Sequence, residues 1–392
     1  MFTIEASYKL TTPLFMGGFD SKGEPEIRPP AIKGLLRFWW RAAALPQLGT
    51  WDKVREAERE LFGSTDGQAA FLLLTEIKGN LNKGSAGEEW KNRHGLAYLG
   101  YGVVDRNTTT RPYVKPGADI VLRLLLKKGE NAKTLAQGLK ALGLFGGAGA
   151  RARKGFGSLT LTSLSVNGEE KWAPPASVPE LAQAIKGFLA GIGLGQNRET
   201  MPPYTAFSAG SAVRILKCGR DALSLLDEIG KELLAYRSYG SCRKSDRSGR
   251  HVLPWEAVAE QNFAGDHDLI QGYLRGKRIT QHPKRAAFGL PHNYYFMSTR
   301  EGASVEAETE DGKRRASPLF IHIHSLKEGE YAAVAALLPA EFLPRGARIK
   351  ISVTRGNRQE PALLNCSPDY GIIKSFFDRP AFKFNSGMVV WP

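Results

Sequence analysis

The residues in this sequence with the clearest potential for chemistry are clustered cations, and the first group is Lys33, Arg37 and Arg41. They recur at every fourth position, so a helix would place them in one row about one turn apart. A solvated helix face usually combines such cations with acidic residues, but no acidic residue occurs from Ile27 to Trp51. We therefore predict that this row, with Arg28 before it, binds an anionic partner.

A second group of cations lies in a glycine-rich stretch between residues 142 and 159. Its six glycines would let backbone amides approach a phosphate chain, and its three cations supply positive charge. A flexible turn is the alternative interpretation. The stretch has neither the ending of a P-loop nor the strand-to-helix position of a dinucleotide fingerprint, so no cofactor is expected. The candidate phosphate-binding residues here are Gly147, Gly149, Arg151, Arg153, Lys154 and Gly155.

A third group lies between Tyr236 and Arg250, where five cations occur with one acid and two tyrosines. Four of these cations are arginines, which form bidentate contacts with phosphate, and tyrosine rings stack on bases. We predict contact with RNA, the alternative being a disordered surface loop whose charge serves only solubility. The cations are Arg237, Arg243, Lys244, Arg247 and Arg250.

Two further pairs of residues could carry catalysis. His322 and His324 would share one face of a strand and could chelate a metal or act as a general base. No Cys, Asp or Glu in that strand completes a site, so we favour a polar sheet face. Asp20 and Glu24 lie in a loop rich in Gly and Pro, where carboxylates are usually solvated. We therefore predict neither a catalytic residue nor a metal site.

The overall charge also favours a nucleic-acid partner. Lys and Arg number 54 and Asp and Glu 39, which gives a net charge of +15 and an isoelectric point of about 9.6. An anionic membrane surface is the less favoured alternative. With 42% hydrophobic and 24% charged residues the chain is typical of a globular protein.

The sequence contains no run of the roughly 18 to 20 apolar residues that span a bilayer, and its first ten residues are typical of a strand, not of a signal peptide. We therefore expect a cytoplasmic protein without a membrane partner. Cys218, Cys242 and Cys366 are widely separated, so they fit neither a disulfide framework nor a zinc site and should be reduced.

The elements that position these cations follow from hydrophobic periodicity. Pro29 and Pro30 suit the first turn of a helix, and apolar residues recur with the helical period from Ile32 onward. The first 165 residues are predicted to form strand, helix, helix, strand, strand, strand, helix and strand, which suits a ferredoxin-like antiparallel sheet backed by helices. The predicted strands include 2–10, 69–77, 98–104 and 118–126, and the predicted helices after the first are 51–62 and 131–144.

The length of 392 residues predicts two domains. Clustered prolines predict a connecting segment at residues 168–203, between an N-terminal domain at 1–167 and a C-terminal domain at 204–392. In the second domain we expect a strand at 213–216, a helix at 222–236 and a strand at 318–324. The aromatic segment 374–378 is expected to pack or to dock on a partner.

Three segments together resemble the RAMP superfamily of CRISPR-associated proteins, and within it the Cmr module of type III-B effectors. They are residues 28–41, the loop end at 153–158 and residues 314–320. The resemblance implies an α+β fold of two ferredoxin-like, RRM-related domains. It implies guide RNA, near its 3′ end, and target RNA as ligands, and other RAMP subunits of the Cmr complex as partners in antiviral defence. It also adds Arg314 and Arg315 to the RNA-binding candidates.

The resemblance leaves two functions open. The subunit it points to is non-catalytic, whereas other members of the superfamily are metal-independent endoribonucleases that process precursor CRISPR RNA through a histidine. Seven histidines keep the second function open, but none lies near the cationic helix. We favour the RNA-binding subunit, and we expect the cations of the helix and of the glycine-rich loop to face one groove.

Overall fold

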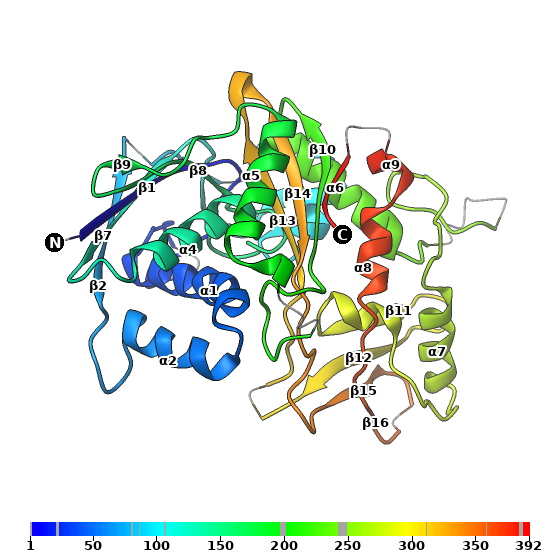
Figure 1. Ribbon diagram of the computed structural model, residues 1–392. Helices are drawn as coiled ribbons and strands as arrows, with labels where there is room; N and C mark the ends of the chain where they lie inside the picture. The colour runs from blue at the N-terminus through cyan, green and yellow to red at the C-terminus, as the bar shows by residue number, and fades with distance from the viewer. Residues whose placement is uncertain are drawn as a thin grey trace.

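A computed structural model shows the arrangement of the chain (Figure 1). It describes residues 2–20, 23–79, 81–85, 87–105, 107–196, 201–241, 249–310, 312–357, 359–383 and 387–392. Within these ranges the chain forms one five-stranded sheet, two four-stranded sheets and two short two-stranded ladders. Figure 1 shows the first sheet at one end of the molecule, the second in the middle and the third at the other end.

The first sheet is antiparallel and has a ferredoxin-like order. Its elements are β1 (Phe2–Leu10), α1 (Pro29–Leu48), α2 (Trp51–Phe62), β2 (Phe71–Lys78), β7 (Asp119–Leu126), α4 (Ala132–Phe145), β8 (Leu159–Val166) and β9 (Glu169–Glu170). The strand order is β2-β7-β1-β8-β9, so β1 lies between β7 and β8. Without α2 and β9, the chain order is βαββαβ, which confirms the predicted arrangement of this half.

Local sequence signals set the ends of the first helices. Pro29 and Pro30 occupy the first turn of α1, and Gly49 follows its last residue with a φ of 78°, a left-handed conformation that favours glycine. The buried face of α1 includes Trp39 and Trp40. α2 begins and ends at the predicted residues, and Gly63 caps it.

The predicted strand at residues 98–104 is wrong. Residues 98 and 99 instead end α3 (His94–Leu99), and within the segment only Val104 belongs to a strand. The side chain of Asp227 fixes the start of α3, because it accepts hydrogen bonds from the backbone nitrogens of Gly95, at 2.9 Å, and Leu96, at 3.1 Å. A Cβ atom at Gly95 would lie 1.8 Å from the carbonyl oxygen of Asp227, so only glycine permits this close packing. The surrounding insertion also contains β3 (Lys83–Gly84), a short helical turn (Glu88–Trp90), β4 (Val104–Asp105), β5 (Thr108–Thr109) and β6 (Tyr113–Val114).

The second sheet repeats the arrangement of the first. Its elements are β10 (Ala212–Gly219), α6 (Ala222–Arg237), β13 (Leu319–Ser325), β14 (Tyr331–Leu337), α8 (Gly371–Phe377), α9 (Pro380–Lys383) and β17 (Met388–Trp391). The strand order β13-β14-β10-β17 again places the first strand between the third and the fourth. α5 (Val178–Gly191) and a short turn (Leu194–Gln196) connect the two halves.

Two insertions into the second half pair with each other to form the third sheet. The first insertion lies between α6 and β13 and contains α7 (Ala264–Leu274), a short helical turn (Lys284–Phe288), β11 (His292–Phe296) and β12 (Glu301–Glu308). The second lies between β14 and α8 and contains β15 (Arg348–Arg355) and β16 (Ala362–Leu364). The strand order β11-β12-β15-β16 leaves β11 at one edge.

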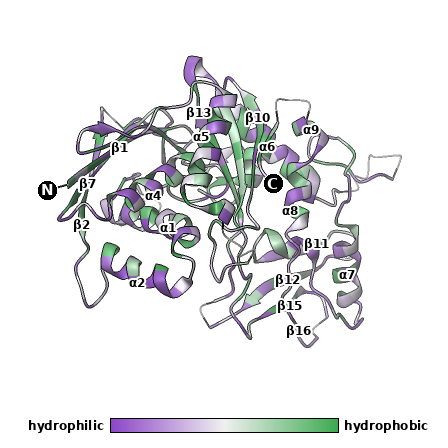
Figure 2. Cartoon of the chain, viewed as in Figure 1, coloured by the Kyte–Doolittle hydropathy of each residue, from purple (hydrophilic) through white to green (hydrophobic). Residues whose placement is uncertain are grey.

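Helices cover both faces of the second sheet. α4 and α5 from the chain before β10 pack on one face, and α6 and α8 pack on the other. Alternate residues of β14 therefore enter different cores: Val334 belongs to the cluster around α1 and α4, and Ala335 belongs to the cluster around α6. The strands of this sheet are largely hydrophobic in Figure 2. The aromatic segment 374–378 packs here, where Phe376 and Phe377 are buried.

Candidate nucleic-acid interface

The cationic row on α1 is compensated by an acid from the next helix. The buried carboxylate of Glu58, on α2, forms an ion pair with Arg37 and lies 3.6 Å from Nη1 of Arg41. The ammonium group of Lys33 lies 5.4 Å from the centroid of the Phe71 ring. The expectation of an uncompensated row was therefore wrong, because the acid that pairs with it comes from α2, outside residues 27–51.

The opposite side of α1 contacts the glycine-rich loop. Leu35, Phe38 and Trp39 line a cavity of about 140 Å³ together with Arg153 and Phe320. Helical geometry places these positions on the far side of α1 from the cationic row. The two groups of cations therefore do not face one groove as expected.

The glycine-rich loop is fixed by backbone hydrogen bonds. Ala148 donates to the carbonyl of Gly157 at 2.8 Å, and Ala150 donates to the carbonyl of Phe15 at 2.8 Å. Gly149 has a φ of 78°, and a Cβ atom there would lie 2.5 Å from the carbonyl oxygen of Phe15. The loop needs this glycine for a left-handed turn and for close backbone packing. It is a rigid support for its cations, and the amides named here already have partners within the protein.

Arg153 joins this loop to the second sheet. Its Nη1 donates to the carbonyl of Ser317 at 2.6 Å, and its guanidinium lies 4.7 Å from the ring centroid of Phe320 and 5.3 Å from that of Phe38. Burial, and then the charge of Arg315, lower the pKa of Arg153 from 12.5 to about 10. These contacts make Arg153 a link between the two halves of the chain.

The ammonium nitrogen of Lys154, the next residue, has no hydrogen-bond partner among the described residues. The residue is half-buried, but its ammonium nitrogen is shielded from solvent. Burial, and then the charges of Arg237, Arg151 and Arg153, lower the pKa of Lys154 from 10.5 to about 7. An anion beside this nitrogen would stabilise its charged form.

Arg237 completes the cationic surroundings of Lys154. Its guanidinium lies 4.6 Å from the ring centroid of Phe288, and its Nη2 lies 3.0 Å from Nε2 of His292. Burial, and then the charges of Arg237 and Arg285, hold the pKa of His292 well below its ordinary value. The neutral imidazole therefore accepts a hydrogen bond from Arg237.

We use the name Lys154 cluster for Arg151, Lys154, Arg237 and His292. Arg151 donates to the carbonyl of Tyr101, and burial followed by the charge of Arg314 lowers its pKa. Within the described ranges no carboxylate forms an ion pair with any member of the cluster, since Asp266 pairs with Arg285 instead. The cluster is a concentration of uncompensated positive charge beside the glycine-rich loop.

Arg314 and Arg315 lie close enough to the glycine-rich loop for their charges to act on Arg151 and Arg153, and they lie next to a larger cavity. They line it together with Arg345, and its volume is about 840 Å³. Arg315 is anchored, because its Nη2 donates to the carbonyl of Glu341 at 3.1 Å and its guanidinium lies 5.8 Å from the ring centroid of Phe342.

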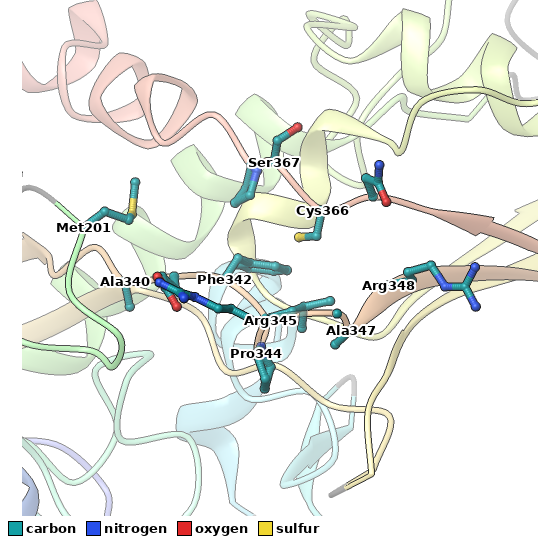
Figure 3. Close-up of a pocket in the computed structure, with 14 residues that line it drawn as sticks. Met201, Ala340, Phe342, Pro344, Arg345, Ala347, Arg348, Cys366 and Ser367 are labelled. Carbon is teal, nitrogen blue, oxygen red and sulfur yellow. The ribbon is translucent and has the colours of Figure 1, made fainter.

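A neighbouring cavity of about 760 Å³ shares part of the wall formed by residues 341–345. Figure 3 shows Met201 and Arg348 at opposite ends of it, with Cys366 between them. Burial raises the pKa of the Cys366 thiol to about 12, so this thiol is protonated. Arg345 and Arg348 give this cavity positive charge, and its thiol is not a reactive thiolate.

The remaining candidates are dispersed. Arg28 is the exposed residue that precedes α1, and Arg250 lies in a described stretch before α7. The backbone of Gly155 accepts a hydrogen bond from the hydroxyl of Thr12 at 2.6 Å, and Gly147 forms a β-bridge with Ser158. Three predicted candidates, Arg243, Lys244 and Arg247, lie outside the described residues.

The histidine pair is not a polar sheet face. His322 and His324 are 1% and 0% exposed, and Nδ1 of His322 lies 2.8 Å from the carbonyl oxygen of Gly146. Burial lowers the pKa of His322 to about 4. The prediction failed because it assumed one solvated sheet face, whereas α4 covers this one. The pair supports the glycine-rich loop.

The structure also places the other candidates for chemistry. Glu24 forms an ion pair with Lys83 at 2.6 Å. Within the described ranges no three His, Cys, Asp or Glu residues are grouped as metal ligands would be, and no helix is long and apolar enough to cross a membrane. Sequence analysis missed His292 and Arg345 as members of cationic surroundings, and neither lies in a motif that would have indicated them.

Comparisons with known proteins agree with the resemblance drawn from the sequence. Residues 7–160 match the RAMP superfamily. The chain is 24% identical over 325 residues to the CRISPR system Cmr subunit Cmr1-1 of Pyrococcus furiosus, which covers 82% of each protein. It is 28% identical over 185 residues to Cmr1-2 of the same organism, which covers 42% of this chain and 95% of that protein.

Solved structures share the fold. The crystal structure of apo Cmr1 from Pyrococcus furiosus matches with a TM-score of 0.60 and 18% identity, covering 100% of this chain and 99% of that one. A chain in the cryo-EM structure of the type III-B Cmr-beta complex bound to cognate target RNA matches with a TM-score of 0.54 and 14% identity, covering 98% and 99%. These likenesses confirm the α+β fold class.

Proposed function

We propose that this protein is an RNA-binding subunit of a type III-B Cmr effector ribonucleoprotein. The starting point is the match of residues 7–160 to the RAMP superfamily. The observation that carries the proposal is the Lys154 cluster, where a shielded ammonium group without a hydrogen-bond partner lies among arginines. A backbone phosphate would supply the missing anion if the half-buried Lys154 side chain turns outward to meet it. The net charge of +15 provides the wider attraction that RNA binding requires.

The ligands we propose are guide RNA near its 3′ end and target RNA, and the partners are other RAMP subunits of the complex. The similarity to Cmr1-1 and to a chain of the Cmr-beta complex with target RNA supports this assignment. In this role the subunit positions RNA during antiviral interference. The domains we propose remain residues 1–167 and 204–392, joined by 168–203.

We also propose that the subunit does not cut RNA. A general base must reach the proton that it removes within about 3 Å, whereas His322 and His324 are buried. The neutral imidazole of His292 already accepts a hydrogen bond from Arg237. These contacts favour binding over the alternative, a metal-independent endoribonuclease that processes precursor CRISPR RNA.

Binding and cleavage can be measured together with a labelled single-stranded RNA. We expect the logarithm of the binding constant to fall with the logarithm of salt concentration by roughly 0.7 per phosphate neutralised. Denaturing gels should show intact RNA, with and without divalent ions. No binding to RNA, alone or with partner subunits, would overturn the proposal, and specific cuts abolished by His292→Ala would favour the endoribonuclease.

A further inference from the structure

We propose that the cavity between the segment after α6 and the edge strand β11 binds one unpaired base of a single-stranded RNA. This inference rests on the proposed function. It gives the bound RNA a second contact with the protein, next to the phosphate site at the Lys154 cluster. The cavity has a volume of about 530 Å³, within the range of small-molecule sites in proteins.

The walls of the cavity contain flat rings at stacking distances. The ring of Tyr239 lies parallel to that of His267, with centroids 3.8 Å apart and an angle of 5° between the planes. His251 lies 4.8 Å from Tyr239, and Phe296 lies 4.9 Å from His267. Proteins that read single-stranded RNA hold unstacked bases against such aromatic faces.

Polar groups in the same cavity match the edges of a base. Asn293 is exposed on β11, and its amide both donates and accepts hydrogen bonds. Arg285 is held by Asp266, whose Oδ2 accepts from the Arg285 backbone nitrogen at 2.8 Å, and its guanidinium lies 4.6 Å from the Tyr294 ring centroid. The hydroxyl of Tyr294 is buried, lies near Arg285 and has no well-aligned hydrogen-bond partner among the described residues. These groups could orient a base that stacks on the Tyr239–His267 pair from outside, since the two rings already contact each other.

The cavity adjoins the Lys154 cluster. Nη1 of Arg285 donates to the carbonyl of Arg237 at 3.1 Å, and His292 of the cluster directly precedes Asn293 in β11. Successive residues of this strand therefore contribute to the two sites. A nucleotide with its phosphate at the cluster could turn its base into the cavity.

A peptide strand is the competing occupant, because β11 is an edge strand and its outer backbone groups could pair with an added strand. An added peptide strand would bind mainly through backbone hydrogen bonds. Such binding would not require the stacked rings of Tyr239 and His267 or the neighbouring Arg285 and Arg237. A nucleotide would use both the rings and the cations. We therefore favour RNA, and the experiment below separates the two.

The experiment combines a change in the protein with a change in the RNA. The probe is a labelled single-stranded RNA of mixed sequence in which an abasic nucleotide replaces each position in turn. We expect one position at which base removal weakens binding by about 5- to 150-fold, the effect of one stacked base. Tyr239→Leu should cause a similar loss with the intact RNA and little further loss with that abasic RNA.

Control variants separate the possible results. Phe2→Leu, an aromatic change on the first sheet, should leave affinity unchanged, and thermal unfolding should show that Tyr239→Leu is folded. If Tyr239→Leu weakens binding of the abasic RNA by the same factor as it weakens binding of the intact RNA, the two losses are independent and the proposed base site is wrong. An effect of Tyr239→Leu on subunit assembly without an effect on RNA affinity would also overturn the base site, and would indicate a peptide strand.

Failure of this inference differs from failure of the proposed function. If no abasic position matters but Lys154→Met still weakens RNA binding, the base site is wrong and the phosphate site remains. If the protein binds no RNA at all, both proposals fall.

Discussion

The cationic row on α1 and the Lys154 cluster are built from the same kinds of side chain, but their surroundings differ. Arg37 and Arg41 surround the buried carboxylate of Glu58, which neutralises part of their charge. Lys154 lies among Arg151, Arg153 and Arg237, and its ammonium group has no partner within the described ranges. The row is more regular in the sequence, whereas the cluster is assembled from three separate segments.

This difference assigns the two regions opposite roles. A cation that is paired with an acid inside the protein stabilises the fold and attracts an anionic ligand more weakly. Uncompensated charge that is shielded from water costs stability in the free protein, and binding of an anion relieves that cost. Removal of charge from the row should therefore lower the free energy of unfolding with little effect on RNA affinity, whereas removal of charge from the cluster should lower RNA affinity and raise the free energy of unfolding.

The largest effect is expected from the double variant Arg37→Ala and Arg41→Ala. It leaves the carboxylate of Glu58 buried without its partners, which should lower the free energy of unfolding by about 3 kcal/mol in urea denaturation. RNA affinity should change little. The matched control is Lys53→Ala with Arg55→Ala, which removes the same charge from exposed positions on α2. A tenfold loss of RNA affinity at unchanged stability would instead show that the row binds RNA.

The next effect is expected from Lys154→Met, which keeps a chain of similar length without the charge. RNA affinity should fall about tenfold or more, because a charge-assisted hydrogen bond is lost. The free energy of unfolding should rise by at least about 1 kcal/mol, since the shielded charge and its repulsion are removed. Lys140→Met is the control, because burial also lowers the pKa of Lys140, on α4. Equal effects of the two variants on RNA affinity would contradict a specific phosphate site.

The smallest effect is a dependence of RNA affinity on pH. The pKa of Lys154 is about 7 in the free protein, and a phosphate favours its charged form, so binding takes up a proton. Affinity should fall from pH 7 to pH 9 by less than about tenfold per pH unit, and Lys154→Met should abolish this fall. An identical pH profile in the variant would exclude Lys154 from the contact.

The free energy of unfolding should depend on pH in the opposite sense to RNA affinity: it should rise as the pH rises. The unfolded chain keeps Lys154 protonated up to its ordinary pKa of 10.5, whereas the folded chain begins to release the proton near pH 7. The folded state is therefore penalised fully below about pH 7, and the penalty falls as the pH rises toward 10.5. The stability difference between Lys154→Met and the unchanged protein should narrow over this interval.

Hydrophobic periodicity and the residues at helix ends were sufficient to predict most of the helices and strands of the first half. Pro29 and Pro30 mark the start of α1, and Gly63 marks the end of α2, because φ restrictions and caps act within a few residues. The predicted strand at 98–104 failed where Asp227, more than a hundred residues away, caps α3. Only the family resemblance implied a ferredoxin-like second half, because two insertions separate its strands and hide their order from the local sequence pattern.

The candidate site divides in the same way. The sequence by itself determined the excess of positive charge, the glycine-rich loop and the cations that follow it. Only the tertiary structure decided which cations are paired, because Glu58 reaches Arg37 from another helix and Arg237 reaches Lys154 from the other half of the chain. Electrostatic interactions depend on distance in space and on burial. Neither quantity can be read from the spacing of residues along the chain.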